Sequence, residues 1–375
     1  MCAVGLEKLT RLAKVDYGFP FESSLFTDNS VYMPLIRIRD IKPAKASTYY
    51  EGEYSDRYVV RKGDILVGMD GEFNLERWND RDGLLNQRIL RIKAIDGLSN
   101  ESYLYHLLAP LFKNIEKKVQ GGSVKHLSAK IIENLYIPYV DFEEQVLIGK
   151  QLDTFTTLIS NLESELDMRR KQYEHYRNQL LDFEGVEELS LSEIFEMRGG
   201  YTPSTKNEEF WEDGILPWFR MEDIRENGNI LSDSTLHITP KAVKKNGLFP
   251  MNSIILATSA TIGVHALLTV PALSNQRFTA FYPKEKFEDK VNYKYTYYVF
   301  YIIDEWCKNN TVQGGFASVD MAGLRKYLFP LPSLAKQQEI VEKLDAFENL
   351  IQSLEQEIKL RKQQYEYYRE KLLTF

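Results

Sequence analysis

The residues that could carry out chemistry are scattered along this 375-residue sequence and do not form a catalytic motif. It contains no GxxxxGK(S/T) phosphate loop, HExxH zinc helix, GxSxG nucleophile turn or Asn/Asp-Pro-Pro-aromatic tetrapeptide. The carboxylates Asp64, Asp70 and Glu72 could form a nuclease-like cluster, but among 54 acidic residues this is uninformative. The histidines lie singly and are expected to be structural or surface residues: His106, His126, His175, His237 and His265. We therefore predict a non-catalytic chain that binds no metal or cofactor itself.

Composition limits the remaining classes of function. The only cysteines, Cys2 and Cys307, cannot form a disulfide framework or a four-cysteine zinc site. The net charge of −7 argues against a surface coated with phosphate-binding positive charge, so any nucleic-acid binding must use local patches. The length suits two domains and an elongated element. No apolar run reaches membrane-spanning length and no signal-peptide pattern is present, so we expect a cytoplasmic protein.

Two segments of the sequence, 145–183 and 337–375, repeat one another without a gap at an offset of 192 residues. The clearest match joins RRKQYEHYR at 169–177 to RKQQYEYYR at 361–369. Apolar and aromatic residues recur in steps of three and four, which predicts a coiled-coil seam between two helices. An amphipathic helix packed on its own domain is the alternative. The predicted seam comprises Leu152, Phe155, Ile159, Leu162, Leu166, Tyr173, Tyr176, Leu180, Leu344, Phe347, Ile351, Leu354, Ile358, Tyr365, Tyr368 and Leu372.

The repeat continues through the globular parts in the same order, with insertions between its members. The matching elements are PLIRIRDI (34–41) with PWFRMEDI (217–224), Gly18-Phe19-Pro20 with Gly200-Tyr201-Thr202-Pro203, Asn86-Gln87-Arg88 with Asn275-Gln276-Arg277, Gln120-Gly121-Gly122 with Gln313-Gly314-Gly315, and Pro138 with Pro330. The sequence predicts strands at 36–39, 64–67 and 253–256, and helices at 102–117 and 293–308, with a possible break at Pro110. Each copy is thus expected to contain a mixed α and β domain, which ends at a proline before its long helix.

These motifs, taken together, resemble the specificity subunits of type I restriction-modification systems over essentially the whole chain. The second copy carries the GYTPS-like entry at 200–204, and the first departs from it with Gly18-Phe19-Pro20-Phe21. The resemblance implies an α+β fold with target-recognition domains at 1–143 and 184–335. It places the conserved spacer helices at 144–183 and 336–375, forming an antiparallel coiled coil. It also implies double-stranded DNA as the ligand.

Partner subunits are implied by the resemblance and by no particular residue. They are two methyltransferase (M) subunits, which bind S-adenosylmethionine, and motor-nuclease (R) subunits, which use ATP and Mg. No membrane partner is implied.

The duplication itself leads to a geometric expectation. Antiparallel equivalent helices, each leaving its own domain, place the domains at opposite ends of a rod of roughly 45 Å for about 30 residues. Each domain would then read one half of a bipartite target, and helix length would set the spacer. The arrangement is pseudo-two-fold and nearly circular, so Phe375 should lie near Met1. Across the seam, Arg169 should face Glu355 and Arg361 should face Glu163.

Base reading requires polar side chains on loops, with Arg to guanine and Asn or Gln to adenine as common pairs. In the first domain the base-reading candidates are Arg77, Arg81, Asn86, Gln87 and Arg88, and the phosphate candidates are Lys42, Lys45 and Arg57. In the second they are Tyr201, Thr202, Ser204, Thr205, Lys206, Arg225, Asn275, Gln276 and Arg277, with Lys241, Lys244 and Lys245 for phosphates. Because Asn-Gln-Arg recurs in both domains, it either contacts DNA or supports a loop. The Gly121-Gly122 and Gly314-Gly315 turns either allow close approach to DNA or only a sharp turn.

Two other classes of function fit the same elements. A non-catalytic scaffold would use the helices to space two protein-binding domains, and exposed aromatic patches would favour it. An RNA-binding protein would need exposed aromatic rings for stacking unpaired bases.

Overall fold

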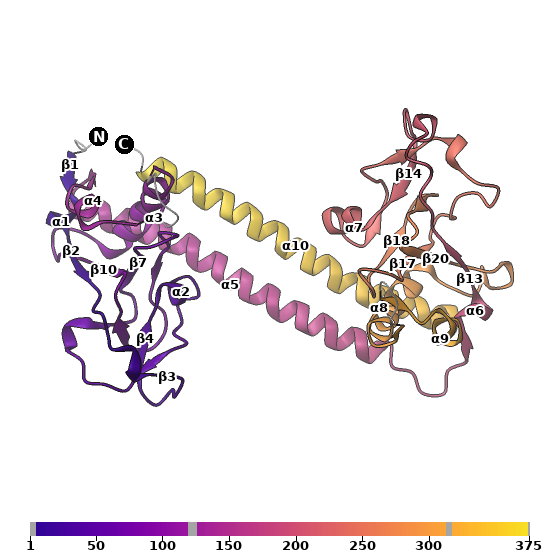
Figure 1. The fold of residues 1–375 in the computed structure, drawn as a ribbon, viewed down its shortest axis with the longest axis horizontal. Coiled ribbons are helices and arrows are strands. Elements are labelled where there is room, and N and C mark those ends of the chain that lie inside the picture. The colour runs from indigo at the N-terminus through magenta and orange to yellow at the C-terminus, as the bar shows by residue number, and fades with distance from the viewer. Residues whose placement is uncertain (1–4, 119–125, 313–316, 374–375) are drawn as a thin grey trace. The chain divides into compact units, whose positions relative to one another are not determined.

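The computed structural model describes residues 5–118, 126–312 and 317–373, which form two compact units (Figure 1). Unit 1 contains the described residues up to Glu165 together with those from Glu355 onward, and unit 2 runs from Leu166 to Leu354. Each unit therefore combines one globular part with one end of each long helix.

Unit 1 is built from short strands and one long covering helix. Its strands are β1 (Gly5–Lys8), β2 (Ala13–Tyr17), β3 (Phe26–Thr27), β4 (Met33–Ile36), β5 (Tyr49–Tyr50), β6 (Val59–Val60), β7 (Ile65–Gly68), β8 (Leu75–Arg77), β9 (Gly83–Leu85), β10 (Ile89–Ala94) and β11 (Tyr136–Tyr139). Its helices are α1 (Leu9–Leu12), α2 (Ile38–Ile41), α3 (Glu101–Lys118) and α4 (Ala129–Glu133). The main sheet has the order β2-β10-β7-β8, and a second has the order β3-β5-β4-β9-β6 with β4 and β9 parallel. Helix α3 shares one core with the main sheet, where Val67, Leu90 and Leu104 are fully buried.

Unit 2 repeats this plan. Its strands are β12 (Glu188–Ser190), β13 (Phe195–Gly199), β14 (Leu216–Phe219), β15 (Ile230–Leu231), β16 (His237–Ile238), β17 (Ile254–Ala257), β18 (His265–Leu268), β19 (Leu273–Ser274), β20 (Phe278–Pro283), β21 (Thr311–Val312), β22 (Ser318–Val319) and β23 (Leu328–Pro330). Its helices are α6 (Leu191–Ile194), α7 (Met221–Asn227), α8 (Tyr293–Asn309) and α9 (Met321–Lys326). The main sheet has the order β13-β20-β17-β18-β15, and β14 lies between β16 and a parallel partner, β19. The predicted duplication of a mixed α and β domain is confirmed.

The two long helices, α5 (Phe142–Leu180) and α10 (Leu334–Leu373), pack antiparallel within each unit. In unit 1, Phe155 stacks on Tyr368 with ring centroids 5.4 Å apart, and further along Glu163 pairs with Lys362 at 2.7 Å. In unit 2, Tyr176 stacks on Phe347, also at 5.4 Å. Positions rise along α5 as they fall along α10, as predicted. Of the helices in the described ranges, none has the length and apolar character needed to cross a membrane.

The seam positions and the predicted partner of Glu163 differ in outcome. Fourteen of the sixteen seam residues are buried or half-buried, whereas Tyr176 and Tyr368 are exposed, although each stacks on a phenylalanine. Glu163 pairs with Lys362, the neighbour of the predicted Arg361, and Arg361 bonds within its own helix to Glu357 and Gln364.

A buried glutamine ties each long helix to the globular part that precedes it. In unit 1, Gln145 accepts a hydrogen bond from the backbone of Asn100 at 3.0 Å and donates to the carbonyls of Leu98 and Val140. In unit 2, 192 residues later, Gln337 accepts from Asn292 and donates to Lys290 and Pro332 in the same way. Both glutamines are fully buried. The start of each long helix is therefore fixed to its own domain by the same contacts.

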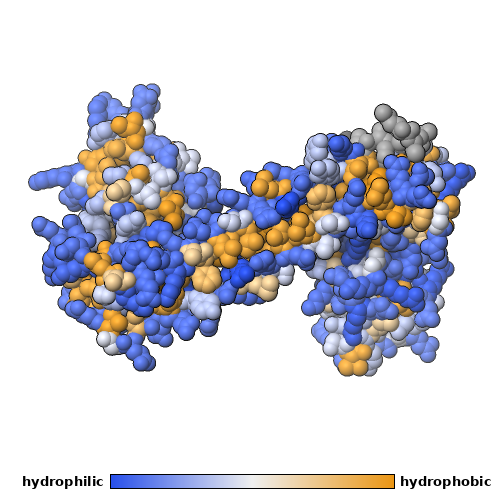
Figure 2. Space-filling view, turned by 180° about the vertical axis from the view of Figure 1, so that it is seen from behind, coloured by the Kyte–Doolittle hydropathy of each residue, from blue (hydrophilic) through white to orange (hydrophobic). Residues whose placement is uncertain are grey.

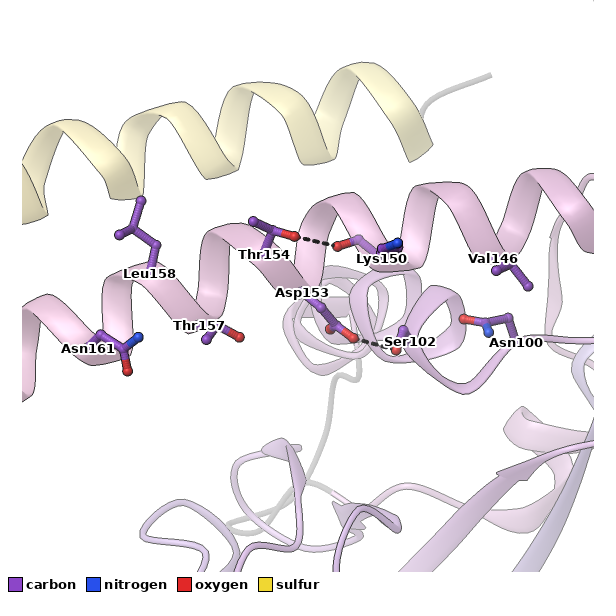
Figure 3. Close-up of a pocket in the computed structure, with 9 residues that line it drawn as sticks. All are labelled: Asn100, Ser102, Val146, Lys150, Asp153, Thr154, Thr157, Leu158 and Asn161. Carbon is purple, nitrogen blue, oxygen red and sulfur yellow. Dashed lines mark hydrogen bonds between the residues drawn. The ribbon is translucent and has the colours of Figure 1, made fainter.

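A second contact fixes α5 about two turns further on, around Asp153 (Figure 3). Its carboxylate accepts hydrogen bonds from Ser102, Arg77 and the Nε2 of His106, at 2.5, 2.8 and 2.9 Å. The other ring nitrogen of His106 lies 2.9 Å from the hydroxyl of Tyr365 on α10. Because an ionised carboxylate can only accept, the Nε2 of His106 is the atom that donates to Asp153. The side chain thus joins α3 to both long helices.

Lowering the pH should reduce the stability of unit 1, because His106 is protonated more readily in the unfolded chain. Burial lowers the pKa of its imidazole to about 4, although Asp153 opposes the shift. Between the ordinary pKa and this value, the unfolded chain binds a proton that the folded chain excludes, so stability falls as pH falls. From pH 7 to pH 5 we expect this residue to cost about 2 kcal/mol of unfolding free energy. Native-state hydrogen exchange of α3, measured at both pH values in the unmodified chain and in His106→Gln, gives this loss of unfolding free energy. Equal losses in the two proteins would contradict the assignment.

The structure corrects one predicted strand and shows that one predicted helix is unbroken. The strand predicted at 36–39 ends at Ile36, and α2 begins at Ile38 because Asp40 caps the backbone N–H of Arg37 at 2.9 Å. The equivalent PWFRMEDI segment likewise passes from β14 into α7. Helix α3 continues through Pro110 without the expected break.

The first and last described segments both belong to unit 1. Leu373 lies in the same buried core as Leu9 and Ile137, and Ile137 belongs to the strand that pairs with β1. Met1 and Phe375 themselves lie outside the described residues.

Candidate nucleic-acid interface

Two motifs that are far apart in the sequence meet in unit 1. The segment Gly18-Phe19 crosses the Asn-Gln-Arg loop, with the N–H of Phe19 donating to Leu85 and the N–H of Gln87 donating to Phe19, both at 2.9 Å. A Cβ at Gly18 would lie 1.9 Å from the carbonyl oxygen of Asn86. Only glycine permits this approach.

The same crossing is present in unit 2. Tyr201 donates its N–H to Ser274 at 2.9 Å, and a Cβ at Gly200 would lie 2.2 Å from the carbonyl oxygen of Asn275. Here a side-chain bond is added, since the hydroxyl of Thr202 donates to the Oε1 of Gln276 at 2.6 Å. Thr202 and Gln276, both candidates from the sequence, are therefore neighbours.

A third segment completes the site in each unit. In unit 1 the N–H of Met69, just after β7, donates to Arg88, and the N–H of Leu127 donates to Met69. The equivalent bonds in unit 2 run from Thr258 to Arg277 and from Val319 to Thr258, at 2.9 Å each. Leu127 and Val319 follow the two Gly-Gly turns, Gly121-Gly122 and Gly314-Gly315, which lie outside the described residues.

The three crossing segments form the same backbone arrangement in both units, which we call the frame. The side chains around this frame differ between the units. In unit 1, Asp70 pairs with Arg88 and lies 2.6 Å from the Nδ1 of His126. Burial raises the pKa of Asp70, but hydrogen bonds from His126 and Arg88 more than offset it, so the pKa is lowered from its usual value. Unit 2 has Ser259 and Ser318 in these places. The backbone frame is repeated, and the groups that it presents are not.

The other base-reading candidates of unit 1 are engaged in protein contacts. Arg77 pairs with Asp153 and lies over the ring of Tyr105, 4.3 Å from its centroid. Arg81 donates to the carbonyl oxygens of Ser30 and Tyr32. Asn86 is buried, and its side chain accepts from the N–H of Gln87. These contacts favour structural roles for all three and leave Gln87 and Arg88 as the exposed members of the loop.

The phosphate candidates of unit 1, Lys42, Lys45 and Arg57, are all exposed. They follow α2 or precede β6, on loops of the second sheet. The carbonyl of Arg57 accepts a hydrogen bond from the buried Arg91, which holds that loop in place.

The candidates of unit 2 lie largely on exposed loops. Tyr201 is half-buried, donates its hydroxyl to Ala242 and lies under the ammonium group of Lys244 at 4.2 Å. Lys241 pairs with Glu209 at 3.4 Å. The remaining exposed candidates are Ser204, Thr205, Lys206, Arg225, Lys245, Gln276 and Arg277, while Asn275 is half-buried.

Nothing in the described ranges gathers three or more His, Cys, Asp or Glu side chains as a metal site would. The repeated feature is instead a polar loop at a strand end, present once in each unit. The class to which such a chain belongs is one in which a single polar site is repeated in two similar domains.

Comparison with known proteins identifies this class. Residues 6–168 and 184–360 match the family described as the type I restriction modification DNA specificity domain, and the chain belongs to that family. It is 50% identical to the Escherichia coli type I restriction enzyme EcoprrI specificity subunit over 53% of each chain. It is 34% identical to the EcoR124I/EcoR124II specificity subunit of the same species, over 87% of this chain and 84% of the relative.

A solved structure has the same fold. The type I restriction-modification system S subunit from M. genitalium superposes with a TM-score of 0.62 at 16% identity, covering 100% of this chain and 97% of the other. The predicted family and fold class are thus confirmed.

Proposed function

We propose that this chain is the non-catalytic DNA-specificity subunit of a type I restriction-modification complex. Each unit reads one half of a bipartite duplex target, and the paired helices α5 and α10 set the length of the spacer. The observation that carries the proposal is the repeated crossing of Gly18 and Gly200 with the Asn-Gln-Arg loops. Two copies of one backbone frame with different side chains suit two half-sites of different sequence.

The exposed groups at each frame are suited to duplex DNA. Arg88 and Arg277 can each donate two hydrogen bonds to guanine, and Gln87 and Gln276 can each form two hydrogen bonds with adenine, to N6 and N7 in the major groove. Phosphate contacts from nearby lysines would fix the register without reading sequence. Because the net charge is −7, these local groups and the partner subunits must supply the affinity.

The partners proposed are two methyltransferase subunits, which bind S-adenosylmethionine, and motor-nuclease subunits, which use ATP and Mg. Apolar side chains gather along the surface of the long helices (Figure 2). Exposed apolar residues recur 192 positions apart, with Leu158 matched by Leu350 and Met168 by Leu360. A repeated apolar surface supports two copies of one partner.

The decisive test is a map of modified adenines in the genome of the host with and without this chain. We expect the chain to be required for modification at one asymmetric motif of two short specific parts separated by a fixed gap. An unchanged map would contradict the proposal and favour the scaffold alternative, which predicts no effect on modification. Restoring the chain on a plasmid should restore the same motif, which controls for effects of the deletion.

A further inference from the structure

One arginine occupies the same place in both units and was not among the candidates from the sequence. Arg37 follows β4, and Arg220 follows β14. Each of these strands is parallel to the strand that leads into an Asn-Gln-Arg loop, with Ile36 level with Leu85 and Phe219 level with Ser274. Since parallel strands end at the same edge, Arg37 lies beside Asn86 and Arg220 beside Asn275. The N–H of Asn275 donates to Phe219 at 3.1 Å, which fixes this neighbourhood.

The local fold does not require an arginine at either position. The helix that follows each strand is capped by an aspartate, which accepts from the backbone N–H of Arg37 at 2.9 Å or of Arg220 at 2.7 Å. Any residue other than proline supplies that N–H. The neighbouring residues have also diverged, since Arg39 of unit 1 is matched by Glu222 in unit 2. The guanidinium group is kept in both copies although the cap makes no use of it.

Both guanidinium groups retain free donors. Arg37 is exposed, and within the described ranges no hydrogen bond or ion pair of its side chain is seen. Arg220 makes one long contact, 3.9 Å to Glu222, and its buried Nε has no hydrogen-bond partner in the described part of the chain. A buried donor without a partner is costly unless a ligand satisfies it.

We infer that Arg37 and Arg220 are equivalent phosphate-binding residues, each of which holds the DNA backbone beside the loop that reads bases. This inference rests on the proposed function. Each half-site presents the same sugar-phosphate backbone whatever its bases are, so a guanidinium group at the same place in both units can make the same phosphate contact in each. A guanidinium group meets phosphate oxygens with two parallel hydrogen bonds. The divergent neighbours, such as Asp70 and Ser259, would then account for different base preferences.

The test uses the tagged full chain, isolated from its host with the subunits that co-purify, and a pool of random-sequence duplexes. Arg37→Ala and Arg220→Ala should each weaken binding to the selected duplex roughly tenfold. Each should also reduce the slope of log affinity against log salt by about 0.9, with the selected motif unchanged. Arg37→Lys should keep most of the slope, because lysine still neutralises a phosphate.

Matched controls are Arg39→Ala, whose guanidinium group already bonds Thr48 at 3.0 Å, and Arg325→Ala, exposed on α9. Both remove the same charge and should leave the slope near that of the unmodified chain. If Arg37→Ala and Arg220→Ala match these controls, the inference fails. A motif altered at one position would assign base reading instead and would also overturn it. If the unmodified chain enriches no duplex, it is the proposed function that fails.

Discussion

Replacing Arg91 with alanine should lower the unfolding free energy of unit 1 by about 3–5 kcal/mol. Arg91 lies on β10, with its Nη2 2.7 Å from Asp16 and its Nη1 3.4 Å from Asp64. All three side chains are more than nine-tenths buried. Without the guanidinium group, Asp16 keeps only a surface contact with Lys14 at 3.6 Å, so a buried carboxylate loses its main partner.

The loss should reach the candidate interface as well. The same guanidinium group donates to the carbonyl oxygens of Arg57 at 3.0 Å and Val59 at 2.5 Å. The first carbonyl belongs to a phosphate candidate and the second to β6, so residues 57–60 should exchange faster in Arg91→Ala even where the main sheet remains formed. Native-state hydrogen exchange of β2, β10 and residues 57–60 separates the two effects, because it reports each segment by itself.

Unit 2 supplies the matched control. It has Ala280 at the place of Arg91, and Arg198 on the adjacent strand β13 donates to the loop carbonyls of Asn246 and Gly247. No acidic side chain pairs with Arg198 in the described ranges. Arg198→Ala should therefore cost only about 1 kcal/mol, the usual worth of hydrogen bonds without a stranded charge. A loss as large as that of Arg91→Ala would contradict the stranded-carboxylate account.

A double substitution tests the same explanation by removing the buried carboxylate together with its arginine partner. Asp16→Arg with Arg91→Ala copies the arrangement of unit 2 into unit 1, and Asp64 keeps Lys93 at 3.1 Å. We expect the double variant to recover more than half of the loss caused by Arg91→Ala alone. No recovery would mean that the arginine matters for its packing and not for its charge.

This arginine also illustrates the limit of reading the sequence. The period of the long helices is a local pattern, so the sequence could predict α5, α10 and the seam between them, while the resemblance implied their antiparallel direction. Arg91 and Asp16 are brought together only by the pairing of β10 with β2, across 75 positions. Nothing near either residue marks them as partners. The position that is arginine in one copy is alanine in the other, so the repeat gave no signal either.

The interface was predictable in its parts and not in its geometry. The repeated Gly-aromatic and Asn-Gln-Arg motifs marked the correct segments, because both copies need them for one backbone crossing. The role of each side chain depended on burial, which spacing does not reveal. Asn86 was predicted to read bases because it is polar and lies on a loop, yet it is buried and bonds the backbone of Gln87. Arg37 was missed because the predicted strand, 36–39, placed it inside a strand, whereas β4 ends at Ile36 and Arg37 follows it.

Replacing Gly200 with alanine should disable the recognition site of unit 2. The new methyl group would lie 2.2 Å from the carbonyl oxygen of Asn275 and 2.4 Å from that of Ser274, both backbone atoms that cannot rotate away. Relieving this overlap requires moving the loop or opening β13 from β20, at about 3 kcal/mol or more. We expect binding of the selected duplex to fall by roughly a hundredfold, the equivalent of that strain.

The neighbouring glycine provides the control, because a Cβ at Gly199 has no atom within 4 Å. Gly199→Ala restricts the unfolded chain in the same way and should bind DNA as the unmodified chain does. Hydrogen exchange of β13 then distinguishes two causes of the lost DNA binding in Gly200→Ala. Unchanged protection in Gly200→Ala with lost binding assigns the effect to the displaced Gln276 and Arg277, whereas faster exchange assigns it to unfolding of the sheet. Equal binding by the two variants would mean that the crossing of these segments has no part in recognition.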